Sequence, residues 1–152
     1  MNKSFWFLFR VVIVLILATV LVVGCGKEYT PQDGVISEVT MATAVDSNDR
    51  PLQPTDVFTV DTEVFYCSLK LSHFPPGTKI KADWVYVSGE AGGGVPENTV
   101  IKTNTGTIDG DGYTSIALQR PSYTGVKWPK GDYKVVLSVG DEEKASASFR
   151  VE

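Results

Sequence analysis

The side chains able to perform acid–base or nucleophilic chemistry are few in this chain. His73 is the only histidine, and it stands before two prolines at the end of a predicted strand, where we expect it to be solvated. Cys67 precedes it on the same strand, and extended backbone at roughly 3.3 Å per residue separates the two by about 20 Å. A nucleophile and its base must lie within hydrogen-bonding distance. We therefore expect no enzymatic activity.

A run of acidic residues and glycines, Asp109-Gly110-Asp111-Gly112, has the composition of a calcium loop. An EF-hand loop also needs an oxygen ligand at its fifth position and Glu at its twelfth. Counted from Asp109, those positions hold Tyr113 and Arg120. Asp-Gly is a strong signal for a tight turn. The sequence therefore predicts a hairpin turn here, and no metal or other non-covalent cofactor.

The third chemical candidate is a cysteine that follows the first apolar run. This run, Val11–Val23, is interrupted only by Thr19 and follows a basic stretch containing Lys3 and Arg10. It is shorter than the roughly 20 apolar residues of a membrane-spanning helix, and it fits the apolar region of an export signal. Its end, Leu21-Val22-Val23-Gly24-Cys25, resembles the lipobox of bacterial lipoproteins.

The lipobox resemblance implies cleavage between Gly24 and Cys25 and covalent acylation of Cys25, including palmitate. A lipid of more than one chain anchors a protein stably, since each buried methylene contributes roughly 0.8 kcal/mol. The expected location is the cell membrane or outer membrane, on the extracytoplasmic side. An uncleaved signal anchor from Phe5 to Val23 is the alternative, and Arg10 inside that span counts against it.

The charge balance after cleavage excludes one class of partner. Residues 1–24 contain Lys3 and Arg10 and no acidic residue, so 12 basic and 18 acidic residues remain and the net charge becomes −6. Nucleic-acid binding depends on neutralising phosphates with Lys and Arg, so we expect no nucleic-acid partner. Lipidation of Cys25 would also leave Cys67 without an intramolecular partner, and no disulfide framework is expected.

The sequence divides into three parts: a helical signal peptide at 1–24, a polar lipidated tether at 25–34 and a folded domain at 35–152. Fully extended, the tether spans about 30 Å. Beyond it, apolar and polar residues alternate, and the strand 35–44 is expected to place Val35, Val39 and Met41 on one face. The strand 99–105 is expected at a sheet edge. The other predicted strands cover residues 57–60, 63–72, 79–88, 113–119, 133–139 and 145–151.

Seven or eight short strands without helices predict an all-β antiparallel sandwich. Three features resemble the immunoglobulin fold: Cys67 at the place of its first core cysteine, Trp84 on the following strand, and Tyr133 in a run like its tyrosine corner. Val135 occupies the place of the second cysteine. The resemblance implies an immunoglobulin-like domain without the disulfide, in which Cys67 is a small buried residue with an inert thiol.

This fold hosts many functions, so the expected function depends on the loops. Arg120, Tyr123 and Trp128 lie in one aromatic loop whose residue types favour protein binding. We expect a non-enzymatic protein-binding or envelope-assembly module. The alternative is glycan or cell-wall binding through Tyr123 and Trp128, unless Trp128 instead packs over the sandwich end. A third alternative is protease inhibition, from a similarity of Gly92–Gly94 and Arg120-Pro121 to chagasin-type inhibitors, whose Asn-Pro-Thr-Thr-Gly loop is missing here.

Overall fold

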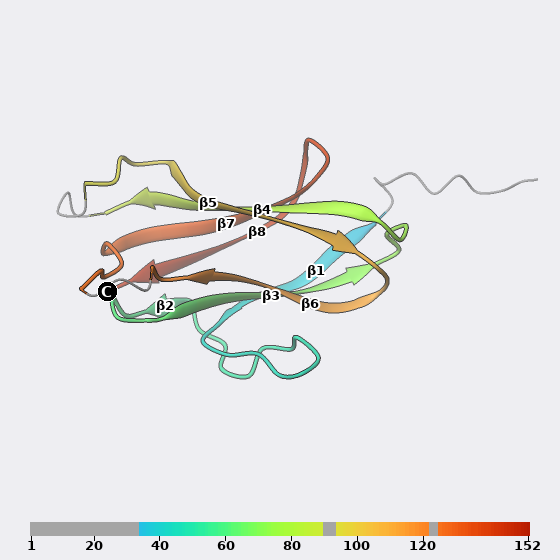
Figure 1. Cartoon of the computed structure of the whole chain (residues 1–152), viewed down its shortest axis with the longest axis horizontal. Helices are drawn as coiled ribbons and strands as arrows, with labels where there is room; N and C mark the ends of the chain where they lie inside the picture. The colour runs from blue at the N-terminus through green and yellow to red at the C-terminus, as the bar shows by residue number, and fades with distance from the viewer. Residues whose placement is uncertain (1–33, 90–93, 122–124) are drawn as a thin grey trace, which may run out of the picture.

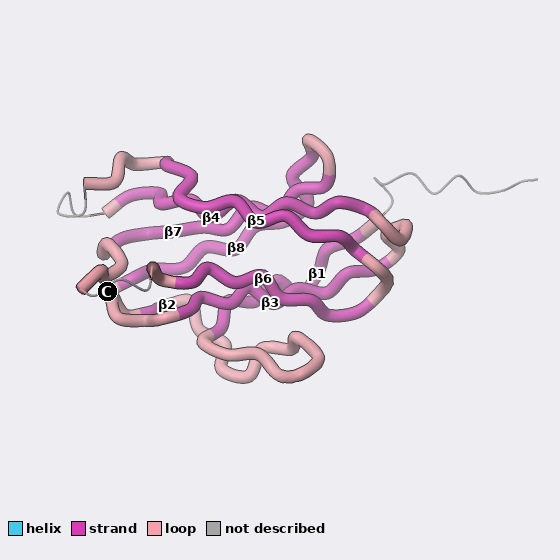
Figure 2. Tube along the Cα trace, viewed as in Figure 1, coloured by secondary structure: helices cyan, strands magenta, loops and turns pink. Residues whose placement is uncertain are grey.

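Two facing β-sheets make up the computed structural model, which describes residues 34–89, 94–121 and 125–152 (Figure 1). The predicted signal peptide and residues 25–33 of the tether lie outside the described residues. Figure 2 shows strands and loops alone in the described part of the chain. The strands are β1 (Val35–Ala42), β2 (Val57–Phe58), β3 (Val64–Ser72), β4 (Thr78–Ser88), β5 (Thr99–Ile108), β6 (Gly112–Gln119), β7 (Gly131–Val139) and β8 (Glu142–Val151).

The smaller sheet has the order β1-β3-β6 and the larger one β2-β8-β7-β4-β5. The predicted all-β sandwich and the edge position of β5 are confirmed. One pairing departs from the antiparallel prediction, because β2 pairs with β8 in parallel. The start of β1 and the end of β8 lie at opposite ends of the sandwich (Figure 1). We call these the N-terminal and C-terminal ends.

The turn at Asp109–Asp111 corrects a prediction. The sequence indicated a hairpin, but β5 pairs with β4 in the larger sheet and β6 pairs with β3 in the smaller one. The chain therefore crosses between the sheets at this turn. Asp-Gly specifies a tight change of direction and leaves the pairing partner to the packing of distant strands.

A bulge in β1 corrects the predicted face of this strand. Pairing with β3 shifts between Ser37 and Thr40, and Glu38 has a φ of 49°. One extra residue reverses the alternation of side chains. Val35 is therefore 51% exposed rather than on the core face. The core-facing residues of β1 are Ile36, Val39 and Met41.

The predicted centre of the domain is confirmed. Cys67 and Trp84 are fully buried on facing sheets, and Val135 is buried beside Trp84, its partner across β4 and β7. Burial raises the pKa of the Cys67 thiol to about 12. The tyrosine corner is also present, since the Tyr133 hydroxyl donates to the Pro129 carbonyl at 2.6 Å.

Residues 43–56 fold over the outer face of the smaller sheet (Figure 1). Ser68 lies on that outer face, yet it is fully buried. Its hydroxyl donates to the Asp49 carbonyl at 2.6 Å, and the Ser115 hydroxyl donates to the Asp49 carboxylate at 2.5 Å. The loop thus satisfies the polar groups that it covers.

Candidate functional site

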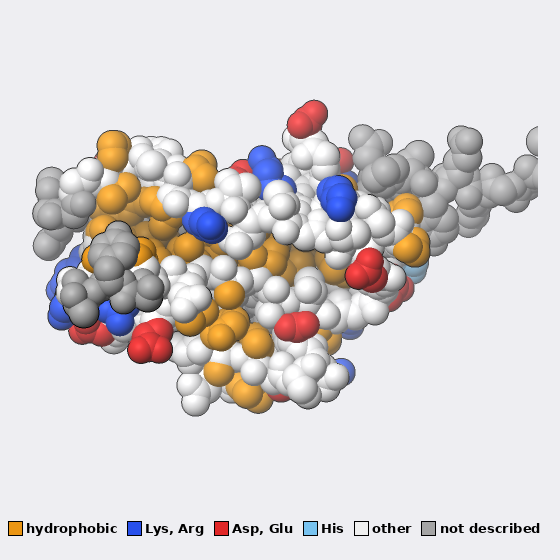
Figure 3. Space-filling model, in the orientation of Figure 1, with side chains coloured by type: hydrophobic (Ala, Val, Ile, Leu, Met, Phe, Trp, Pro, Cys, Tyr) orange, Lys and Arg blue, Asp and Glu red, His pale blue; other side chains and the backbone are white. Residues whose placement is uncertain are grey.

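The unequal widths of the two sheets leave a groove along one side of the sandwich. β5 ends the larger sheet and β6 ends the smaller one, so each is paired on one side only. A groove of about 320 Å³ lies between them. Figure 3 shows hydrophobic side chains gathered along this side of the molecule, between the two strands.

The floor of the groove is apolar. It contains Leu71 of β3, Ile80 of β4, Ile108 of β5 and Ile116 of β6. Gly106 lies directly opposite Ile80 across β4 and β5. Because Gly106 has no side chain, the space above Ile80 stays open.

One wall of the groove changes from polar to apolar along β5. The inward positions of β5 oppose Trp84, Ala82, Ile80 and Thr78, which face the core. In order from the C-terminal end of the sandwich, these positions are Lys102, Asn104, Gly106 and Ile108. The amide oxygen of Asn104 accepts a hydrogen bond from Trp84 Nε1 at 2.9 Å. On β5, the lining of the groove runs from Asn104 to Ile108. Lys102 is exposed and is the next inward position beyond Asn104.

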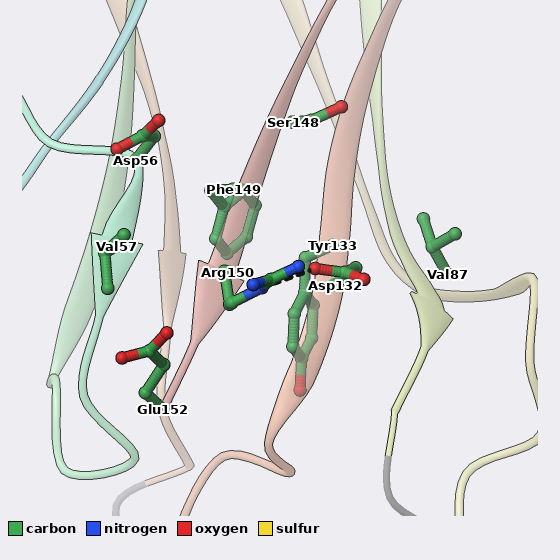
Figure 4. Close-up of a pocket in the computed structure, with 9 residues that line it drawn as sticks. All are labelled: Asp56, Val57, Val87, Asp132, Tyr133, Ser148, Phe149, Arg150 and Glu152. Atoms are coloured by element: carbon green, nitrogen blue, oxygen red, sulfur yellow. Dashed lines mark hydrogen bonds and ion pairs between the residues drawn. The ribbon is translucent and has the colours of Figure 1, made fainter.

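A second hollow of about 420 Å³ lies on the outer face of the larger sheet near its C-terminal end (Figure 4). Arg150 stands at its centre, and its Nε donates to the Asp132 carboxylate at 2.8 Å. Asp56 and Glu152 also line it, beside Val57, which is 48% exposed. The central cation is already paired, and no histidine or cysteine is among the lining residues. This hollow offers less for binding than the groove does.

A charged cluster occupies the outer face of the smaller sheet. The Tyr113 hydroxyl donates to Oε2 of Glu38, and Lys70 Nζ donates to Oε1 at 2.9 Å. The guanidinium carbon of Arg50 lies 5.2 Å from the centre of the Tyr113 ring. The hydrogen bond from Tyr113, followed by that from Lys70, holds the pKa of Glu38 below its ordinary value. These groups satisfy one another across the β1 bulge.

The described residues of the predicted aromatic loop are engaged within the domain. Trp128 is 9% exposed, with its ring centre 4.8 Å from that of Phe65. Arg120 Nη1 donates to the Val126 carbonyl at 2.9 Å and lies 3.9 Å from an oxygen of Asp61. This geometry favours the packing alternative for Trp128 over stacking on a sugar. Tyr123 lies outside the described residues.

Gly24 and Cys25, the predicted cleavage and lipidation residues, also lie outside the described residues. His73 is exposed at the end of β3, as expected, with a φ of 63°. Among the described residues, no group of three His, Cys, Asp or Glu side chains is arranged to hold a metal ion. The same part of the chain contains no helix long and apolar enough to cross a membrane.

The groove was missed by reasoning from the sequence. The only signal for it was the stretch 99–105, which was expected to be a strand at a sheet edge. The sequence did not indicate that β6 would form the edge of the other sheet beside it. A groove requires both edges, so its position depends on strand pairing that short-range patterns do not specify.

The fold resembles that of solved structures with little sequence similarity. An immunoglobulin-like protein from Pseudomonas aeruginosa, PA1606, superposes with a TM-score of 0.53 at 15% identity, over 81% of this chain and 99% of that one. The chain has an immunoglobulin-like fold. No protein-family model and no curated protein sequence matches it.

Two larger proteins contain regions of weaker similarity. Alkylpurine DNA glycosylase AlkC from Pseudomonas fluorescens has a TM-score of 0.44 at 17% identity, over 78% of this chain and 30% of its own. Beta-glucosidase 3B from Thermotoga neapolitana has a TM-score of 0.42 at 11% identity, over 78% of this chain and 16% of its own. Of these three superpositions, only that on PA1606 has a TM-score above 0.5 and supports a shared fold.

Proposed function

We propose that this chain is a lipid-anchored, extracytoplasmic protein whose immunoglobulin-like domain binds a protein partner without catalysis. The observation that carries the binding role is the groove between β5 and β6, which combines an apolar floor with two strand edges. Apolar hollows with a few polar groups at their margins are common binding sites. The lipobox resemblance at Leu21–Cys25 supports the anchor.

The placement of the groove suits a protein tethered close to a bilayer. A tether of residues 25–34 reaches about 30 Å when extended, and the described domain begins at the N-terminal end of the sandwich (Figure 1). The groove lies on the side of the sandwich rather than at that end. A partner in the same envelope layer would therefore reach it laterally.

The anchor is tested by labelling cells with an alkyne analogue of palmitate. The intact protein is expected to incorporate the label, and Cys25→Ser is expected to abolish incorporation. Label retained in Cys25→Ser would contradict lipidation at this residue. Membrane fractionation of both proteins supplies the second readout. The intact protein is expected in the membrane fraction, and Cys25→Ser is expected to be lost from it.

The binding role is tested by site-specific photocrosslinking in intact cells. A photoreactive residue at Ala117, which is exposed and lines the groove, is expected to capture one envelope protein. The matched control is Ser146, which is exposed on β8 away from the groove. Equal capture at both positions, or at neither, would contradict a binding groove. Retention on cell-wall saccharide without a protein crosslink would favour the glycan alternative.

A further inference from the structure

β6 differs from the other edge strands of the sandwich. Free strand edges pair readily with other chains, and proteins protect them with bulges, inward-pointing charges, prolines or short strands. The β1 edge carries the bulge at Glu38, and the β2 edge is only two residues long. The β5 edge carries a pairing shift next to Trp84 and the inward-facing Lys102. Three of the four edges are thus protected.

The remaining edge, β6, has none of these features. Its sequence from Gly112 to Gln119 contains no charged residue and no proline. It pairs with β3 at eight consecutive positions without a shift. A regular and uncharged edge is the kind to which another strand adds.

The space beside β6 has room for such a strand. Neighbouring strands lie about 4.8 Å apart, so a strand added to β6 would lie opposite β5, which no strand of the smaller sheet covers. The groove of about 320 Å³ occupies this position. Side chains that alternate along the added strand would enter the groove at every second residue.

We propose that an extended segment of a partner protein adds to β6 as a fourth strand of the smaller sheet. This inference rests on the proposed function, and it names the chemistry of the partner. An antiparallel segment runs in the direction of β5, so its inward side chains meet Lys102, Asn104, Gly106 and Ile108 in that order. The segment carries a carboxylate near its N-terminal end and apolar side chains at alternate positions after it. The largest apolar side chain lies opposite Gly106, above Ile80.

A second copy of this chain suits the edge less well. β5 and β6 are joined by only three residues, Asp109–Asp111. A second β6 laid against the first would bring its own β5 to the same side of the sandwich. A single extended segment has no such attachment.

The test uses the full-length lipidated protein in nanodiscs and a phage library of random ten-residue peptides. Enriched peptides are expected to carry apolar residues at alternate positions and Asp or Glu toward their N-termini. Lys102→Glu is expected to reverse that preference toward Lys or Arg. No enrichment, or apolar residues spaced three and four apart as on a helix, would overturn the proposal.

A synthetic peptide from this selection then tests the binding mode. Gly106→Leu is expected to weaken its binding at least tenfold, because the new side chain fills the groove. A Cβ at this position meets only Ile80 Cγ2, at an ordinary 3.5 Å, so the variant is expected to fold. Ser146→Leu adds the same side chain away from the groove and is expected to leave binding unchanged. Equal affinity for both variants would overturn the proposal.

Backbone methylation and hydrogen exchange identify the edge that is used. The peptide is methylated at one backbone nitrogen at a time. Methylation is expected to abolish binding at every second position, where the N–H would pair with β6, and to be tolerated at the positions between. Bound peptide is expected to protect from exchange those amides of Gly112–Gln119 that do not already pair with β3. Protection confined to β5 would overturn pairing with β6. Self-association through β6 in sedimentation experiments would also overturn it. If these results fail while the Ala117 crosslink persists, the groove binds a protein in another way and the proposed function stands.

Discussion

The indole nitrogen of Trp128 donates a hydrogen bond to the backbone carbonyl of Thr62 at 2.7 Å. The same residue's backbone N–H donates to the Val60 carbonyl at 3.0 Å. Its ring packs at a tilt against Phe65 of β3. Trp128 thus joins the segment before β7 to the segment before β3 and closes the C-terminal end of the sandwich.

Trp128→Ala is expected to destabilise the domain by about 3–5 kcal/mol, the usual cost of deleting a large buried aromatic side chain. Urea unfolding followed by circular dichroism measures this change. Trp128→Phe is the matched control. It retains a six-membered ring against Phe65 and loses the indole hydrogen bond and part of the buried ring, so a smaller loss is expected. If Trp128→Ala leaves the melting temperature unchanged, Trp128 does not stabilise the core, and a role in ligand binding is favoured.

Tyr133→Phe tests the tyrosine corner. The hydroxyl is buried and donates to Pro129 at 2.6 Å, while the ring stacks on Phe149. Removal of the hydroxyl leaves the ring contact and an unsatisfied carbonyl, so a loss of about 1–2 kcal/mol in the free energy of unfolding is expected. Tyr86→Phe serves as the control, since its hydroxyl makes only a long 3.5 Å contact with the Lys130 carbonyl. Equal losses in the two variants would contradict a special role for the corner.

The parts of the fold that the sequence predicted correctly are those that depend on local alternation. Phe65, Cys67 and Leu69 alternate with Tyr66, Ser68 and Lys70 along one regular strand, and all three are buried in the core. The same alternation gave the wrong face for Val35 in β1. A single bulged residue, Glu38, reverses which residues of this strand face the core. Glu38 is not a residue type that marks a bulge, so the sequence gives no local signal for it.

The candidate groove could not be predicted for a different reason. Ile80 and Ile116 occupy alternating apolar positions of their strands, and both face the core. They line one groove because β5 and β6 are edge strands of different sheets. The sequence of the Asp109–Asp111 turn does not indicate this, because it fits a hairpin equally well. The sequence left two readings of the aromatic loop open, because Trp128 and Arg120 have residue types that occur in binding sites as well as in packed loops. Their burial and internal hydrogen bonds depend on Thr62 and Asp61, about 60 residues away in the chain.

Tyr113→Phe is expected to raise the pKa of Glu38 toward its ordinary value. The hydroxyl of Tyr113 is the main cause that lowers this pKa, and Lys70 is the next. A carboxyl with a lowered pKa contributes stability above its unfolded-state pKa, and the contribution is lost as pH falls through the folded-state value. Because the pair is solvated, the effect on global stability should be small, and carboxyl NMR titration is the measurement. Tyr66→Phe on the neighbouring strand is the control, and an identical Glu38 titration in the two variants would contradict this assignment.

Cys67 is expected to resist thiol reagents as long as the domain is folded. Burial raises its pKa from 9.0 to about 12, and a shift of about three units lowers the thiolate fraction near neutral pH about a thousandfold. In a Cys25→Ser variant, Cys67 is the only cysteine, so its labelling by a chromogenic disulfide at pH 8 reports this site alone. Labelling is expected to be slow in buffer and fast in urea.

The pH dependence of stability gives an independent check on the same group. Its folded-state pKa lies above the unfolded-state value, so its contribution to stability is complete below about pH 9 and declines as the pH rises toward 12. Cys67→Ala removes this pH dependence and some core packing, so the variant is expected to unfold at a lower urea concentration. Above pH 9 the natural protein loses its Cys67 contribution, and the difference in urea midpoint between it and the variant should become smaller. Fast labelling of the folded protein at pH 8, at the rate of an exposed Ser146→Cys control, would mean that the sandwich opens locally at β3. The buried thiol would then report an opening motion of the smaller sheet, the sheet whose free edge forms one side of the groove.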